Sequence, residues 1–237
     1  MGGRKTILWL NCGMLKWFKR SLIFIVGAVL GVQVGIRVLL QFKPVITPSW
    51  IGPLLLSPIR MLYRHPQRVL DFVGPHRGET LLDLGCGNGL LTLEAAKRVG
   101  AEGAVHAVDV QEKMIDQLKK RLSQTDLQNV QTHIAPATRL PLPDASIDHA
   151  VMISVLPMVA DKGVALREVF RVLRPGGTLV IGEEIMEPEY VRARTIQRWA
   201  EQAGFNLVVS DGRAIEYLLK FTRPLTTVEM VKESMSQ

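Results

Sequence analysis

The 237-residue chain contains only two cysteines, few aromatic residues and no acidic residue in its first 70 positions. Cys12 and Cys86 lie far apart, and neither has a second Cys or a His at a ligand spacing, so the sequence predicts no disulfide framework and no metal site. Aromatic residues make up 6% of the chain, but hydrophobic residues of all kinds make up 47%. Such a chain can bury a real core, which fits one α/β domain of ordinary size with a short extra segment.

The charge of the chain is divided unevenly. Residues 1–70 contain ten Lys and Arg, and the first acidic residue is Asp71. The rest of the chain holds 19 basic residues against all 22 acidic ones, so the net charge of +7 comes from the N-terminal part and the body is mildly acidic. Because a nucleic-acid-binding body needs a basic stripe on the folded domain, we expect no nucleic-acid partner.

A long apolar run follows the basic N-terminal segment, residues 1–20. Residues 21–42 are mostly apolar, interrupted by Gln33 and Arg37, and about 20 such residues suffice for a helix to cross a bilayer. We therefore expect a membrane-anchor helix at residues 21–42. Two alternatives remain: a cleaved signal peptide, and a helix that lies in the cytoplasmic leaflet.

Three glycines, Gly27, Gly31 and Gly35, recur at every fourth position of this run. They fall on one helix face and allow a second helix to approach, which predicts a homodimer; the alternative is that glycine is merely tolerated in lipid. Residues 43–65 are also apolar but contain four prolines, so they cannot form a regular helix. We expect them to form either a lid over a functional site or a plain linker.

Residues 66–223 alternate short aliphatic runs with helical patterns, and residues 224–237 form a tail. This alternation is typical of a parallel sheet covered by helices. The expected strands are residues 80–84, 104–109, 129–134, 149–154, 177–182 (entered through the turn "RPGG"), 205–210 and 214–221, the last two joined by a turn at Asp211-Gly212. The expected helices are residues 66–73 and 90–99, one around Leu118, one capped by Asp161, and residues 191–203. We expect a seven-stranded, mostly parallel sheet with helices on both faces and an antiparallel hairpin at its edge.

The stretch "LLDLGCGNG", residues 81–89, stands where the first strand ends and a helix begins. Ligands of such sheets bind beyond the carboxyl ends of the strands, and glycine lets a ligand approach the main chain. The spacing of Gly85, Gly87 and Gly89 departs from the G-x-G-x-x-G fingerprint of dinucleotide sites, because the third glycine comes one residue early. Asp83 would also repel a pyrophosphate and favour a cationic ligand. The sequence therefore disfavours NAD, and a nicotinamide oxidoreductase remains a minor alternative.

The same stretch resembles the D-x-G-x-G-x-G motif of class I S-adenosylmethionine-dependent methyltransferases. "AVDV" (107–110), "LPLPDASIDHAVMISVL" (140–156) and "REVFRVLRPGGTLVI" (167–181) resemble three further regions of this superfamily in the same order. The resemblance implies a Rossmann-like fold and methyl transfer from S-adenosylmethionine, and it is nearest to small-molecule, lipid and quinone methyltransferases, including membrane-anchored ones. Since this cofactor is cytosolic, the body is expected to face the cytoplasm.

The resemblance also implies which residues bind the cofactor. Asp83 would meet its methionine end, and Asp109 would accept both ribose hydroxyls, unless Asp109 only caps the following helix. Val110 and Met114 would wall the adenine. The full set of implied cofactor-binding residues is Asp83, Gly85, Cys86, Gly87, Asp109, Val110, Met114, Ala137 and Ser154. Cys86 is most simply a small residue in the turn.

One position departs from the pattern. Where relatives read "GDAxxLP", with an Asp at the adenine amino group, this chain reads "APATRLP", with Pro136 in place of the acid. The backbone around Ala137 and the hydroxyl of Thr138 remain to hold the adenine. The departure favours weaker cofactor binding, and it leaves open a non-catalytic membrane scaffold as a different class of function.

Methyl transfer needs an aligned acceptor, and it needs a general base only if the acceptor arrives protonated. Glu183 and Glu184, directly after the fifth expected strand, are the expected catalytic residues, with a solvated loop as the alternative. Further candidates on the acceptor side are His65, Ser154, Met158 and Tyr190. An enzyme held at a bilayer gains most from an acceptor that partitions there, so we expect a lipophilic small molecule such as a quinone or a phospholipid; a protein or RNA acceptor is the alternative.

Overall fold

The computed structural model describes residues 66–185, 187, 189–212 and 216–225, together with nine residues between Trp17 and Gly35. The chain divides into two units, residues 1–44 and 45–237. The nine residues of the first unit are all helical. In the part of the chain that the structure describes, no helix combines the length and the apolar character needed to cross a membrane. Most of the expected anchor, all of residues 43–65 and most of the tail lie outside the described residues.

Seven strands of the body form one sheet. They are β1 (Thr80–Leu84), β2 (Ala104–Asp109), β3 (Val130–Ile134), β4 (Ile147–Ile153), β5 (Leu173–Glu184), β6 (Asn206–Gly212) and β7 (Glu216–Thr222). Their order is β3-β2-β1-β4-β5-β7-β6, with the first five parallel to one another and β7 antiparallel to both of its neighbours. The expected mostly parallel sheet with a C-terminal hairpin at its edge is confirmed.

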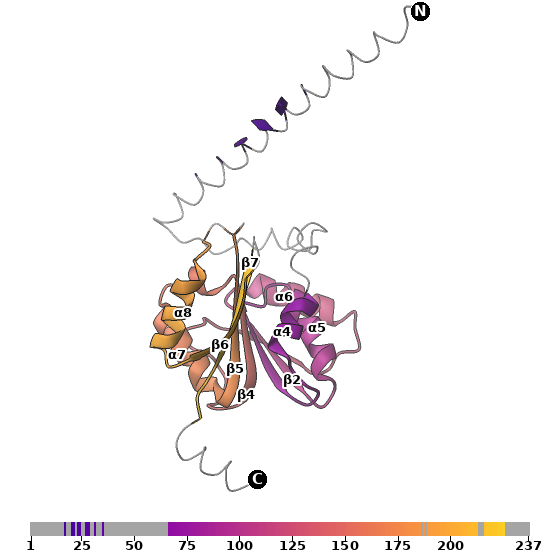
Figure 1. The fold of residues 1–237 in the computed structure, drawn as a ribbon. Coiled ribbons are helices and arrows are strands. Elements are labelled where there is room, and N and C mark those ends of the chain that lie inside the picture. Colours follow the sequence, from indigo (N-terminus) through magenta and orange to yellow (C-terminus); the bar gives the residue numbers. More distant parts are fainter. Residues whose placement is uncertain are drawn as a thin grey trace, which may run out of the picture. The chain divides into compact units, whose positions relative to one another are not determined.

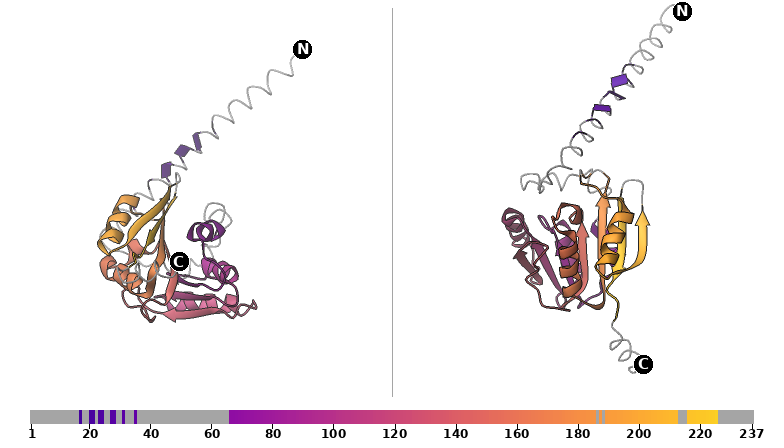
Figure 2. Two further views of the ribbon diagram at one scale, coloured as in Figure 1. Left: turned by 60° about the horizontal axis from the view of Figure 1, so that its bottom comes forward. Right: turned by 90° about the vertical axis from the view of Figure 1, so that its left-hand side faces the viewer.

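Helices cover both faces of this sheet. They are α4 (Pro66–Val73), α5 (Leu90–Val99), α6 (Glu112–Leu122), the short 3-10 helix η2 (Leu156–Met158), α7 (Lys162–Val172) and α8 (Ala193–Gln202). Figure 1 shows α4, α5 and α6 on one face and α7 and α8 on the other, and the right-hand view of Figure 2 looks onto α7 and α8. Successive strand residues point to opposite faces, so Leu81 packs with α4 and α5 whereas Leu82 packs with α7 and α8. The expected cap of α7 is confirmed, because the Asp161 carboxylate accepts a hydrogen bond from the Val164 N–H at 2.9 Å.

Two local expectations were wrong. The fifth strand begins at Leu173 rather than at residue 177, because the "RPGG" residues form an irregularity within β5, where the register with β4 shifts and Gly176 has a φ of 77°. Asp211 and Gly212 do not form the hairpin turn but belong to β6, where they pair with Leu218 and Tyr217. Ladder pairing therefore outweighs the local turn preference of the Asp-Gly pair.

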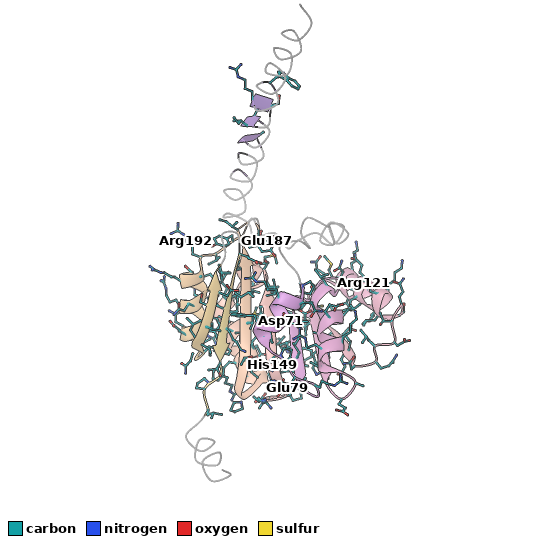
Figure 3. The ribbon with its side chains drawn as sticks, turned by 45° about the vertical axis from the view of Figure 1, so that its right-hand side comes forward. Asp71, Glu79, Arg121, His149, Glu187 and Arg192 are labelled. Carbon is teal, nitrogen blue, oxygen red and sulfur yellow. The ribbon has the colours of Figure 1, made fainter. Side chains whose placement is uncertain are left out.

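The parallel strands give the sheet two distinct ends. The carboxyl end is where β1 to β5 finish, and the amino end is where they begin. In Figure 3, Glu187 and Arg192, which follow β5, lie at the carboxyl end, and Glu79 and His149 lie at the amino end. The glycine turn after β1 lies at the carboxyl end, where ligands of such sheets bind.

Candidate functional site

The three glycines of the turn have different tasks. Gly85, Gly87 and Gly89 have φ angles of 76°, 54° and 83°, which L-residues rarely adopt. A Cβ on Gly85 would come within 2.2 Å of Val155, and one on Gly89 within 2.3 Å of Leu118, whereas one on Gly87 would meet nothing within 4 Å. Gly85 and Gly89 are therefore required by packing, and Gly87 alone leaves open space through which a ligand can reach the main chain.

Asp109, the last residue of β2, is joined to that turn. One carboxylate oxygen accepts a hydrogen bond from the Gly87 N–H and the other from the Gln111 N–H, both at 2.9 Å. The side chain thus accepts a hydrogen bond at the start of α6, which was the alternative role expected for Asp109, and it also holds the glycine turn in place. Burial raises the pKa of the Asp109 carboxyl, and backbone hydrogen bonds from Gln111, Gly87 and Val110 partly offset that rise. Because a carboxylate offers about four acceptor positions, capacity remains for a ligand hydroxyl.

Asp83 lies one residue before the end of β1 and is buried, with 5% of its surface exposed. One of its oxygens accepts a hydrogen bond from the Thr92 hydroxyl of α5 at 2.6 Å. Thr92 orients this carboxylate and is a site residue that the sequence analysis missed. The signal was present, since Thr92 is the only hydroxyl among the otherwise apolar residues on the buried face of α5.

Two further side chains fix the turn. Cys86 is buried, and this burial, together with the charges of Asp83 and Asp109, raises the pKa of its thiol far above the ordinary value. The thiol therefore stays protonated, which agrees with Cys86 being simply a small turn residue. Arg121, labelled in Figure 3, donates from α6 to the backbone carbonyl of Asn88 at 2.8 Å, a contact that the sequence analysis also missed.

The residues expected to surround an adenine meet at the ends of β2 and β3. The Ala135 N–H donates to the backbone carbonyl of Asp109 at 3.1 Å, which places the loop containing Ala137 beside the end of β2. Val110 is 49% exposed and accessible to a ligand, whereas Met114 is only 2% exposed and belongs to the core. Val110 and the loop after β3 are therefore the accessible part of this expected wall.

Ser154 follows β4 and has a φ of 53°, which is unusual for a residue other than glycine. Its N–H donates to the Gly182 carbonyl of β5 at 2.8 Å, and the next residue, Val155, packs against Gly85. A strained backbone of this kind is typical of functional sites. Ser154 therefore lies between the glycine turn and the end of β5. His65, another candidate on the acceptor side, falls outside the described residues.

Glu183 and Glu184 are the last two residues of β5, with 1% and 3% of their surfaces exposed. The solvated-loop alternative was wrong, because the strand continues through both residues and pairs them with Tyr217 and Glu216 of β7. Since neighbouring strand residues point to opposite faces, Glu183 lies on the face of Tyr217, and Glu184 lies on the face of Glu216 and Arg68. The two carboxylates therefore cannot act together as a catalytic pair.

Tyr217 holds the loop that follows β5. Its hydroxyl donates to the Val191 carbonyl at 2.5 Å, and its ring meets that of Tyr190 edge to face with centroids 6.0 Å apart. Burial, the charge of Glu183 and the neighbouring Tyr190 raise the pKa of Tyr217, so the hydroxyl stays protonated as a donor. No local pattern predicts this contact, because 26 residues separate Tyr217 from Val191.

Comparisons with known proteins relate the chain to methyltransferases. Residues 75–223 match a family described as a methyltransferase domain. The chain is 43% identical over 115 residues to an uncharacterized 37.1 kDa protein in transposon TN4556 of Streptomyces fradiae, covering 48% of this chain and 33% of that protein. It is 32% identical over 175 residues to the ubiquinone/menaquinone biosynthesis C-methyltransferase UbiE of Enterobacter sp. (strain 638), covering 70% of this chain and 68% of that protein.

Among solved structures, the chain is similar to a SAM-dependent methyltransferase from Aquifex aeolicus. The TM-score is 0.71 at 25% sequence identity, and the match covers 75% of this chain and 100% of that one. The chain spans only a third of the Streptomyces protein and about two thirds of the Enterobacter one.

Proposed function

Because the chain belongs to the methyltransferase domain family, we propose that it is a membrane-associated, S-adenosylmethionine-dependent methyltransferase acting on a lipophilic small molecule such as a quinone or a phospholipid. The observation that carries this proposal is the junction of Gly87 with Asp109 at the carboxyl end of the sheet. An open stretch of main chain and two buried carboxylates, Asp83 and Asp109, meet there.

The chemistry of these groups fits S-adenosylmethionine. Asp83 supplies a negative charge for an ammonium group, and Asp109 retains acceptor capacity for a ribose hydroxyl. Gly87 leaves room for the ligand above the turn, and Val110 offers an apolar surface for the adenine. When bound, the cofactor supplies a methyl group that is already activated on a sulfonium.

The residues of the chain then contribute mainly by alignment and exclusion of water. Ser154 and Glu183 lie next to the glycine turn and at the end of β5, where an acceptor can approach the cofactor site. Glu183 is the residue suited to take a proton if the acceptor arrives protonated, and the loop held by Tyr217 forms a wall beside it. Glu184 points to the opposite face and has no part in this step.

The relative from Enterobacter supports the acceptor class, because its name describes methylation in ubiquinone and menaquinone biosynthesis. The apolar sequence of residues 21–42 supports membrane association. The glycines at 27, 31 and 35 support a homodimer, since small residues at this spacing on one helix face let a second helix approach. The requirement for a cytosolic cofactor supports a body that faces the cytoplasm.

The central test is transfer of labelled methyl from S-adenosylmethionine by the full chain in membranes. Label is expected in the lipid extract and not in the protein or RNA fractions. Label in protein or RNA would instead establish the alternative acceptor class. The Asp109→Ala variant is the matched control, since weaker cofactor binding should lower transfer into every fraction alike.

Membrane association has its own test. Removing residues 1–43 is expected to move the protein from the membrane pellet to the supernatant. If the shortened protein stays in the pellet, the anchor does not lie in those residues, and residues 44–65 become the segment to examine.

A non-catalytic membrane scaffold is a second candidate, favoured by Pro136 at the position where the resemblance to methyltransferases implies an acid. Calorimetry with S-adenosylmethionine separates the two functions. An active enzyme must bind the cofactor. If no binding is detected at millimolar cofactor, the non-catalytic scaffold becomes the favoured function.

A further inference from the structure

Helix α4 begins at the carboxyl end of the sheet. Arg68, in its first turn, forms an ion pair with Glu216, the first residue of β7, which pairs with Glu184 at the end of β5. At the other end of the helix, the Val73 carbonyl accepts a hydrogen bond at 2.8 Å from Lys220, four residues further along β7. Helix α4 therefore runs from the carboxyl end toward the amino end, and its first residue, Pro66, lies at the carboxyl end.

The exposed large apolar side chains of the body are concentrated at the same end. Ile134 ends β3 and is 52% exposed, and Ile185 follows β5 and is 38% exposed. Val110, which follows β2 and is 49% exposed, also lies at this end but belongs to the proposed adenine site. The remaining two, Val208 and Val209, lie along the edge strand β6. Within residues 66–225, as far as they are described, no exposed large apolar side chain lies at the amino end. Single exposed apolar residues are ordinary on protein surfaces. Here, however, the exposed apolar side chains lie at the same end of the sheet as the candidate cofactor site.

We propose that the carboxyl end of the sheet is the membrane-facing surface of the body, with Ile134 and Ile185 in contact with lipid. This inference rests on the proposed membrane association. The proposed anchor, residues 21–42, is connected to the described body through the start of α4, which lies at this end of the sheet. Apolar side chains at that end gain by leaving water.

This orientation has a consequence for the reaction. The cofactor site, Ser154 and Glu183 all lie at the carboxyl end, so the site opens toward the lipid. A lipophilic acceptor then moves from the bilayer to the site without crossing bulk water. The opposite orientation would place the amino end, with Glu79 and His149, against the membrane (Figure 3).

A fluorescent probe on single cysteines in the full chain tests the orientation. The positions are Ile134→Cys and Ile185→Cys at the carboxyl end, with His76→Cys and Glu102→Cys, both exposed, as controls at the amino end. The background carries Cys12→Ser, and burial raises the pKa of the Cys86 thiol, so Cys86 reacts slowly with the label. The labelled proteins are bound to vesicles of phosphatidylcholine and phosphatidylglycerol, with or without a spin-labelled phosphatidylcholine that quenches fluorescence. Cofactor binding by each variant checks that it is folded.

The expected result is a blue shift and a loss of emission with the spin-labelled lipid at positions 134 and 185, and neither change at positions 76 and 102. If the protein sediments with the vesicles but positions 134 and 185 are not quenched, or all four positions are quenched alike, the orientation is wrong and membrane association stands. If the protein does not sediment with the vesicles, membrane association fails, and the orientation fails with it. Methyl transfer is measured separately, so neither result depends on activity.

Discussion

The backbone N–H of Gly87 donates a hydrogen bond to the carboxylate of Asp109 across 2.9 Å. The two residues belong to different motifs, one in the turn after β1 and the other at the end of β2, and 22 positions separate them in the sequence. The bond brings the open part of the glycine turn and the buried carboxylate to one place. The candidate cofactor site is therefore one connected unit, and substitutions within it should act together.

Replacing Asp109 should weaken cofactor binding. Asp109→Ala removes both the acceptor for the ribose and the bond to Gly87, and hydrogen bonds to charged groups contribute about 1.5–3 kcal/mol, so affinity for S-adenosylmethionine should fall roughly 10- to 100-fold or more. Calorimetry measures the change. Glu112→Gln, at an exposed position of the next helix, is the control that should bind normally. Unchanged affinity in Asp109→Ala would contradict the assigned role.

The turn glycines should separate stability from binding. Gly85→Ala forces a Cβ against Val155 and should lower the melting temperature substantially, because backbone and packing both resist it. Gly87→Ala meets open space, so its loss of stability should be limited to the left-handed backbone, about 1–2 kcal/mol, while its methyl group obstructs the cofactor. Thermal unfolding and cofactor titration of both variants test this. A Gly87→Ala variant that binds the cofactor normally would show that the ligand does not approach there.

The two neighbouring glutamates should behave differently. Glu183→Gln should lower methyl transfer about 100-fold or more if Glu183 is the general base, with little change in cofactor affinity. Glu184→Gln should leave the rate near that of the unaltered protein, because that carboxylate lies on the other face with Glu216. Rates measured against pH for both variants distinguish the roles. Equal losses in the two variants would point to a structural effect.

Stability should fall as the pH is lowered, because of His149 at the amino end. Its ring nitrogens lie 2.9 Å from the Glu79 carboxylate and 2.7 Å from the Thr178 hydroxyl. Burial lowers the pKa of His149 below its ordinary value of 6.5, outweighing the opposite effect of Glu79, so the folded protein holds the ring neutral. The unfolded chain then binds more protons, and the stabilisation present above pH 6.5 decreases as pH falls below that value.

The measurement for this prediction is the melting temperature between pH 7.5 and pH 5, at about half-unit steps, which spans the ordinary range of histidine titration. His149→Gln should be less stable at neutral pH but should depend less on pH over this range. A slope that His149→Gln does not alter would assign the pH dependence to other groups.

Pro136→Asp should strengthen cofactor binding. Pro136 is exposed, and its carbonyl accepts a hydrogen bond from the Arg139 N–H at 3.1 Å, which the substitution can retain. The new carboxylate would stand beside the loop that adjoins Asp109 and could accept from the adenine amino group. Calorimetry should show a lower Kd than that of the unaltered chain. No improvement would mean that the loop around Ala137 already holds the adenine without an acid.

The central helices and strands could be predicted from the sequence because they depend on local patterns. The bounds of α4, α5, β1 and β2 agree with the predicted ranges, since aliphatic runs and helical spacing mark them directly. The start of β5 and the end of β6 were misjudged, because the residues concerned, "RPGG" and Asp211-Gly212, favour turns locally but pair within the sheet. Non-local pairing decided both cases.

By itself, the sequence determined the order of the strands along the chain, the glycine turn, and the two carboxylates at the ends of β1 and β2. These features depend on residue type and short spacing. Only the tertiary structure decided that Val155 and Leu118 require Gly85 and Gly89, that Thr92 and Tyr217 support the site, and that Glu183 and Glu184 point to opposite faces. Each of these depends on which distant segments lie side by side, and spacing along one chain carries no information about that.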